Sequence, residues 1–176
     1  MAQGADVPNQ DSPALAGSLR FSSEPGDLDF ATIHDFIAGQ SYWAAGIPAA
    51  TLRRALDNSI CCSAHLDGRM VAFARAVTDQ ATFAYLADVF VVPEQRGRGL
   101  GRAVVAELMA DPRLQDLRRW HLVTRDMQPL YAQLGFTALS QPELHMQKHD
   151  PEVYSRLAQT PAHDLAPTSP EPAAIP

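Results

Sequence analysis

A run of glycine and arginine at residues 91–102 has the residue types and spacing to bind an anion. It reads Val-Val-Pro-Glu-Gln-Arg-Gly-Arg-Gly-Leu-Gly-Arg and lies between an apolar run, Phe83 to Val92, and a helical pattern, Leu100 to Met109. Glycine permits a left-handed backbone and close approach of a ligand. Free N–H groups at a helix start, together with arginine side chains, attract negative charge. The run therefore predicts a turn that binds phosphate or pyrophosphate.

The glycine spacing narrows the choice of ligand. A dinucleotide site needs G-x-G-x-x-G, but Arg102 stands three positions after Gly99. A nucleotide P-loop needs Lys-Ser or Lys-Thr after its last glycine, and neither follows. The pattern R-x-x-G-x-G, at Arg96, Gly99 and Gly101, resembles the acyl-CoA loop of the GNAT N-acetyltransferase superfamily. The alternative is a glycine-rich surface turn with solvated arginines.

A second motif, residues 131–136, strengthens the resemblance. The sequence Tyr-Ala-Gln-Leu-Gly-Phe is similar to the Y-x-x-L-G-F element that closes the same fold. Its local chemistry predicts a helix over 126–134, with Asp126 as the N-cap and Gly135 just past the end. Pro129 is tolerated in a first helical turn. The alternative for Tyr131 is a packed aromatic residue whose hydroxyl bonds a carbonyl.

The resemblance spans about residues 18–148 and implies an α/β (α+β) fold, a mixed and mostly antiparallel sheet with helices on both faces. Periodicity and turn signals agree with that order of elements. The strongest hairpin signal is Asp67-Gly68. We expect helices at 28–37, 48–56, 100–109 and 126–134, and strands at 19–21, 60–66, 70–77, 81–92, 120–124, 136–139 and 144–147.

The resemblance also implies how acetyl-CoA would bind. Main-chain groups of Val89, Phe90 and Val91 would pair with the pantetheine arm like an added strand, and Thr124 would lie near that arm. An N–H group at Phe90 or Val91 would stabilise the thioester oxygen as it becomes negative, and the sequence leaves both open. The pyrophosphate would lie on the loop formed by Arg96, Gly97, Arg98, Gly99, Leu100, Gly101 and Arg102.

Two residues are candidates for catalysis. The resemblance gives Tyr131 the role of proton donor to the departing CoA thiolate. Asp88 is the single carboxylate in an apolar strand, and a lone acid there must face a cleft, water or a partner. It could hold the acceptor ammonium and relay its proton, or it could be a structural carboxylate bound to Arg75 or to loop amides. Tyr85 stands where some relatives carry a catalytic glutamate, so the base stays open.

The acceptor is expected next to residues 40–48, a loop interrupted by glycine and proline. Tyr42 and Trp43 in this loop would form an aromatic wall, which suits cation–π contact with an amine. The alternative is that Trp43 covers the core beneath the loop.

Composition excludes several classes of protein. The chain has 176 residues, 46% of them hydrophobic, and a net charge of −6, which argues against nucleic-acid binding. We find no apolar run of eighteen residues and no signal-peptide pattern, so we expect no membrane and a cytoplasmic location.

Cys61 and Cys62 are adjacent in the chain, which is a poor geometry for a disulfide, so we expect both to be reduced thiols. The six histidines show no metal-ligand spacing, so no metal is expected.

The sequence predicts one folded domain with a tail at each end. Residues 1–16 are expected to be a disordered tail and 17–150 the GNAT domain. Residues 151–176 are expected to contain a short helix and a disordered tail rich in proline and alanine.

These observations predict an acetyl-CoA-dependent N-acetyltransferase that acts on a primary amine of a small molecule, an amino acid or a peptide, as a monomer or homodimer. The alternative is a non-catalytic acyl-CoA-binding sensor or regulatory module of the same fold. A third interpretation, a nucleotide phosphate site, predicts that ATP protects against thermal unfolding better than CoA does.

Overall fold

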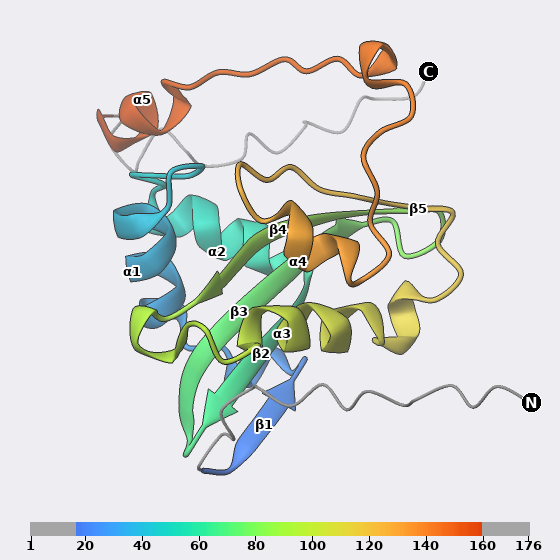
Figure 1. The fold of residues 1–176 in the computed structure, drawn as a ribbon. Coiled ribbons are helices and arrows are strands. Elements are labelled where there is room, and N and C mark those ends of the chain that lie inside the picture. Colours follow the sequence, from blue (N-terminus) through green and yellow to red (C-terminus); the bar gives the residue numbers. More distant parts are fainter. Residues whose placement is uncertain (1–16, 160–176) are drawn as a thin grey trace, which may run out of the picture.

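The computed structural model describes residues 17–159 and is built around one five-stranded sheet in the order β1-β2-β3-β4-β5 (Figure 1). The first four strands are antiparallel neighbours, and the fifth pairs parallel to β4. The predicted tails 1–16 and 160–176 lie outside these residues. The strands are β1 (Leu19–Ser22), β2 (Ile60–Leu66), β3 (Arg69–Thr78), β4 (Phe83–Val91) and β5 (Arg119–His121).

Helices cover both faces of the sheet (Figure 1). On one face Val104 and Leu108 of α3 pack against the small residues of β2 and β3. On the other face Ile33 and Leu52, from α1 and α2, pack around Phe73. The predicted mixed, mostly antiparallel sheet with helices on both faces is confirmed. The helices are α1 (Phe30–Gln40), α2 (Ala49–Asp57), α3 (Leu100–Met109), α4 (Gln128–Ala132) and α5 (Val153–Gln159).

The β2–β3 hairpin turns where the sequence predicts. Asp67 and Gly68 have φ values of 50° and 80°, the left-handed pair that a two-residue turn requires. All seven residues of β2 are buried because β1 and β3 flank it and helices cover both of its faces. This strand forms the centre of the core.

β4 contains a bulge that separates it from β5. Phe73 pairs with Phe90 and Arg75 with Ala87, so two steps along β3 correspond to three along β4. The extra residue falls near Asp88, whose φ is 52°. Pairing between β4 and β5 covers three positions and ends at Tyr85 and His121. We call this divergence the β4–β5 fork: its vertex is the Tyr85–His121 pair, and its arms are 87–91 and 122–124.

The fork shortens one predicted strand. The sequence predicts a strand over 120–124, but β5 ends at His121 because β4 has turned away and offers no further partner. The following helix also begins later than predicted, at Gln128. Met127 is its N-cap residue, so the predicted cap at Asp126 is wrong; Thr124 Oγ1 instead accepts the Met127 N–H at 3.1 Å. The helix also ends earlier than the predicted Leu134, at Ala132 with Gln133 as its C-cap, so Gly135, with φ of 87°, lies two residues past the cap and not directly after the helix.

The two final predicted strands are also wrong. Residues 136–139 and 144–147 belong to no strand, and a 3-10 turn at Pro142–Leu144 separates them. Leu144 is 68% exposed and Met146 is 97% exposed. The apolar alternation is present, but a strand also needs a paired neighbour, and periodicity carries no information about that neighbour.

We predict that Leu108→Ala lowers the free energy of unfolding by about 3 kcal/mol, because the fully buried side chain leaves a cavity against β2 and β3. Urea denaturation followed by circular dichroism measures the change. The matched control is Leu144→Ala, which removes the same atoms from an exposed position and should change stability by less than about 0.5 kcal/mol. Equal losses in both variants would contradict this description of the core.

Candidate active site

The loop between β4 and α3 has the backbone of an anion cradle. Gly97 and Gly99 adopt φ values of 73° and 76°, which strain any side chain-bearing residue. Gly99 is the N-cap of α3 and offers no side chain to the N–H groups of the first turn, which stay free for a ligand. A Cβ at either glycine would meet open space, so the glycines serve backbone conformation and ligand access. The loop fits a phosphate group.

The arginine side chains beside this cradle differ in how far they are buried. Arg96 is exposed, and its Nε donates to the carbonyl of Val91 at 3.1 Å. Arg98 is half-buried and donates to the side chain of Gln95. Arg102 is exposed on the first turn of α3, and Leu100 is buried, so Leu100 anchors the helix and offers a ligand only its main chain. The predicted pyrophosphate loop is thus a continuous, positively charged segment.

The arm of the fork at 89–91 has one unpaired main-chain edge. Phe90 and Val91 pair with β3 on one side, and beyond Tyr85 no strand of residues 17–159 pairs with β4 on the other. The ring of Phe90 is buried and stacks on Phe36 with ring centres 4.2 Å apart. This open edge therefore offers backbone groups of residues 89–91 to an extended ligand, apart from the Val91 carbonyl, which already accepts from Arg96.

Tyr131 lies on α4, half-buried against the α3 side of the core. Its ring meets Phe136 edge to face at 5.9 Å. Burial, and then the nearby Tyr42 hydroxyl, raise the pKa of Tyr131 to about 12, so the phenol is protonated at neutral pH. Thr124 lies at the start of this segment with its hydroxyl held by the Met127 N–H.

Asp88 is paired on both carboxylate oxygens. Arg75 donates to one oxygen through two nitrogens, at 2.7 and 2.8 Å, and Trp43 Nε1 donates to the other at 2.9 Å. The Asp88 side chain is only 7% exposed. Arg75 also donates to Ser59 at 3.0 Å, which ties the pair to the end of α2. Of the two roles that the sequence leaves open for Asp88, this geometry corresponds to the structural one.

The α1–α2 loop reaches across to the other arm of the fork. Tyr42 is 53% exposed, and the guanidinium of Arg125 lies 3.8 Å from its ring centre. The Arg125 N–H also donates to the Tyr42 hydroxyl at 3.3 Å. Trp43 packs edge to face on Tyr42 at 5.0 Å and is 42% exposed. Tyr42 and Trp43 thus form an exposed pair of aromatic rings, and Arg125 covers one face of Tyr42.

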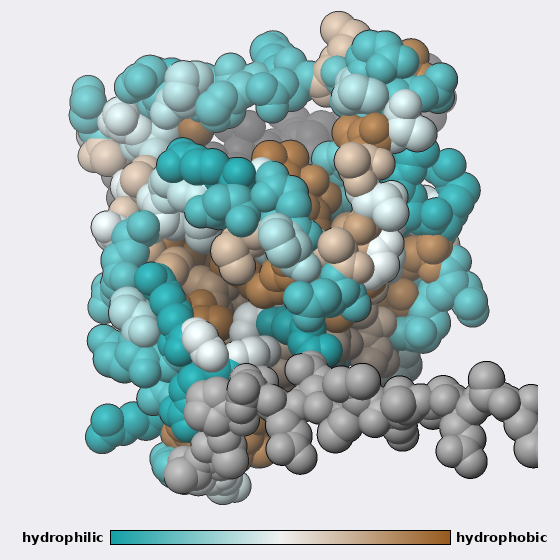
Figure 2. Space-filling view, viewed as in Figure 1, coloured by the Kyte–Doolittle hydropathy of each residue, from teal (hydrophilic) through white to brown (hydrophobic). Residues whose placement is uncertain are grey.

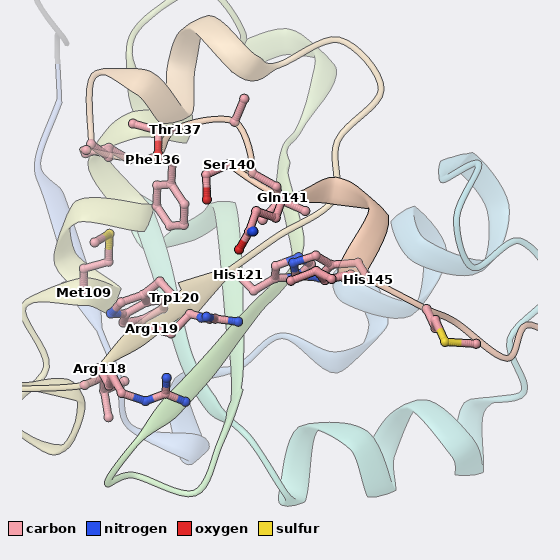
Figure 3. Close-up of a pocket in the computed structure, with 17 residues that line it drawn as sticks. Met109, Arg118, Arg119, Trp120, His121, Phe136, Thr137, Ser140, Gln141 and His145 are labelled. Carbon is pink, nitrogen blue, oxygen red and sulfur yellow. The ribbon is translucent and has the colours of Figure 1, made fainter.

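Three aromatic rings stack at the vertex of the fork. His121 lies between Tyr85, at 5.8 Å, and His145, at 5.5 Å. Figure 3 shows the stacked rings of His121 and His145. Burial lowers the pKa of His121, and His145 and Arg119 lower it further. Burial and the charge of Asp88 raise the pKa of Tyr85. The sequence reasoning missed both histidines, although a polar residue between Trp120 and Leu122 in a strand signals a side chain on the opposite face.

A cavity of about 800 Å³ follows the outer edge of β5 (Figure 3). Trp120, Phe136 and Gln141 contribute to its wall, and His121 is the one residue of the fork vertex among them. Neither the glycine cradle nor Tyr131 is among its lining residues, although Phe136 in its wall contacts Tyr131. Figure 2 shows apolar surface between hydrophilic groups on the face seen in Figure 1.

Other chemistry receives no support within residues 17–159. Cys61 and Cys62 are free and buried, and burial raises their thiol pKa values to about 12 and about 11, so neither is a thiolate nucleophile. No group of three His, Cys, Asp or Glu side chains in this part of the chain is arranged to hold a metal ion. Among its helices none combines the length and apolar character needed to cross a membrane.

Comparison with known proteins decides the family. The sequence model of the acetyltransferase (GNAT) domain matches residues 57–138. A protein of Gibberella zeae, provisionally named an acetyltransferase, is 32% identical over 137 residues, which cover 65% of this chain and 76% of that protein. The chain belongs to the GNAT acetyltransferase family.

Further comparisons extend this result. A GNAT-family crystal structure from Xanthomonas campestris pv. campestris, also provisionally described as an acetyltransferase, is 46% identical. It has a TM-score of 0.75, with coverage of 78% of this chain and 97% of that one. Serotonin N-acetyltransferase 2, chloroplastic, from rice is 46% identical over 67 residues, 35% of this chain and 34% of that protein. This GNAT protein is therefore an acetyltransferase that performs acyl transfer.

We predict that Asp88→Asn lowers the free energy of unfolding by about 3 kcal/mol, because it leaves the Arg75 charge buried without its partner. Asparagine tolerates positive φ, so the backbone at 52° is not the cause. Urea denaturation measures the loss. Asp116→Asn is the matched control, since Asp116 is exposed and has φ of 59°. Similar small losses in the two variants would show that the ion pair contributes little.

Proposed function

We propose that this GNAT protein transfers an acetyl group directly from acetyl-CoA to a primary amine of a small molecule, amino acid or peptide. The observation that carries the proposal is the β4–β5 fork, with an anion cradle at its open end and Tyr131 beside it. A pyrophosphate on the cradle leaves the rest of CoA free to run back along β4 toward the vertex. The cradle would thus hold the pyrophosphate of acetyl-CoA while the open fork accommodates its thioester arm.

The donor would be held mainly by main-chain groups. N–H groups of Gly97 to Arg102 and the flanking arginines suit the pyrophosphate, and each charge-assisted hydrogen bond contributes about 1.5–3 kcal/mol. The unpaired edge at 89–91 suits the amide groups of the pantetheine arm, as an added strand would. Thr124 faces this arm from the other side of the fork in our proposal.

The chemistry then needs charge stabilisation and a proton. We propose that the N–H of Phe90 or Val91 donates to the thioester oxygen as the amine attacks. When the carbon–sulfur bond breaks, the thiolate, with an ordinary thiol pKa of about 8.5, is stabilised by the Tyr131 hydroxyl, which supplies its proton. The raised pKa of Tyr131 keeps that hydroxyl protonated until it is needed.

The acceptor would approach beside the α1–α2 loop. Tyr42 and Trp43 offer exposed ring edges there, and Asp88 fixes Trp43 in place. The rice relative's name gives serotonin, an arylalkylamine, as its acceptor. We therefore include an arylalkylamine among the acceptors to be tested.

One observation favours the second candidate, a non-catalytic acyl-CoA-binding module. Both oxygens of Asp88 are paired, so the acid in β4 is not a free base. An acyl-CoA sensor needs the cradle and the strand edge but no base. The two candidates differ in turnover, not in donor binding.

A thiol-release assay separates them. Full-length protein is given acetyl-CoA with spermidine, 2-phenylethylamine, L-alanine or an alanyl tripeptide, and free CoA is titrated with a thiol reagent. We expect release with at least one amine and mass spectra that show the acetylated product. Binding of acetyl-CoA without release with any amine would support the sensor and contradict the proposal.

We predict that Tyr131→Phe lowers kcat by about 10²-fold and leaves the Kd of acetyl-CoA within about twofold, because only the hydroxyl is removed. Steady-state kinetics and calorimetry measure the two values. Tyr154→Phe, a partly buried tyrosine of α5, is the matched control and should keep full turnover. Near-normal kcat for Tyr131→Phe would show that another group supplies the proton.

A further inference from the structure

The vertex of the β4–β5 fork lies where a bound thioester would point. The cradle follows the end of β4 at Val91, so a ligand that runs from it along the 91–88 edge is directed toward Tyr85 and His121. At about 3.3 Å per residue, Asp88 and Tyr85 are about 10 Å apart along the strand. A thioester bound in this way on the 88–91 edge would therefore bring its acetyl group close to the side chains at the vertex.

Most acids and bases near this position are already engaged. Asp88 is paired with Arg75 and Trp43. The phenol of Tyr85 is protonated at neutral pH because burial and Asp88 raise its pKa. The ring nitrogens of His121 are the exception, since they have no hydrogen-bond partner among residues 17–159.

His121 is also held in a fixed orientation. Its ring is half-buried and stacks between Tyr85 of β4 and His145, with interplanar angles of 27° and 11°. Register pairing with Tyr85 fixes its backbone at the last position before the strands separate. An imidazole with two free nitrogens is therefore anchored at the vertex.

We propose that His121 is the general base of the transfer reaction, which takes a proton from the acceptor ammonium. This assignment rests on the proposed function. The imidazole lone pair accepts one ammonium proton, directly or through a water, and the freed amine pair attacks the thioester carbon. The carbon–sulfur bond breaks, its electrons stay on sulfur, and the sulfur takes the Tyr131 proton. The acetylated nitrogen still carries a second proton to be lost, and this proton passes to the Tyr131 phenolate and restores its hydroxyl. His121 releases its own proton to solvent.

The surroundings keep His121 in the form that this step needs. Burial is the main reason that its pKa lies below the ordinary value, and the like charges of His145 and Arg119 act in the same direction. The other titratable side chain in contact with His121 is that of Tyr85. Asp88 and Arg75 lie beyond Tyr85, and their opposite charges neutralise each other. The ring is therefore neutral at pH 7 and able to accept a proton.

The test is the pH dependence of kcat/KM with the amine that the wild-type protein acetylates fastest in the panel above. For an amine of pKa about 10, we expect a flat wild-type profile from pH 7 to 9 and a fall below the ordinary histidine pKa of about 6.5. In His121→Gln only the amine that is already deprotonated reacts, so kcat/KM at pH 7 is about 10²-fold lower than in the wild type. The kcat/KM of this variant then increases about tenfold for each unit by which the pH is raised. The Kd of acetyl-CoA should stay unchanged.

His145→Gln tests the assignment without removing the base. It takes away a like charge and part of the burial, so the pKa of His121 rises and the acid fall of kcat/KM moves to higher pH. His149→Gln, an exposed histidine of the same segment, is the matched control and should leave the profile unchanged.

The outcomes separate the two levels of the proposal. Wild-type protein that binds acetyl-CoA but acetylates no amine overturns the proposed function and this assignment with it. Wild-type turnover with an unaltered profile in His121→Gln overturns the assignment alone. The assignment is also overturned if the fall of kcat/KM at acid pH occurs at the same pH in His145→Gln as in the wild type. This result holds even if His121→Gln fails to fold.

Discussion

The bend of β4 at Asp88 positions the other parts of the candidate site. A residue at φ of 52° inserts one extra position into the strand, and its carboxylate is held by Arg75 and Trp43. The bend turns β4 away from β5, which leaves the main-chain edge at 89–91 unpaired. The same carboxylate fixes the α1–α2 loop through Trp43. One buried ion pair thus connects the core, the strand edge and the α1–α2 loop.

Burial sets the protonation of the candidate catalytic groups in opposite senses. It raises the pKa of Tyr131 and lowers the pKa of His121, because a low-dielectric environment disfavours the charged form of each. At neutral pH one group is therefore a protonated phenol and the other a neutral imidazole. In the proposed reaction these are the forms that a proton donor and a proton acceptor require.

Local features of the structure were predicted well from the sequence. The Asp67-Gly68 turn and the glycine cradle before α3 depend on backbone preferences that single residues express. The errors concern strand partners and helix ends. Residues 136–139 and 144–147 alternate like strands but find no neighbour. Asp126 has the chemistry of a cap, but the N-cap position is Met127, one residue later.

The class of fold, the glycine turn before α3 and the helix that carries Tyr131 could be predicted from the chain alone, because they follow from short motifs with strict backbone requirements. The pairing of Asp88 with Arg75 and Trp43, and the place of His121 beside Tyr85 at the fork, come from the packing of the folded chain. Trp43 and Asp88 are 45 positions apart in the chain, and Tyr85 and His121 come from different strands. Contacts at such separations depend on the bulge and the register of the sheet, which no local pattern encodes.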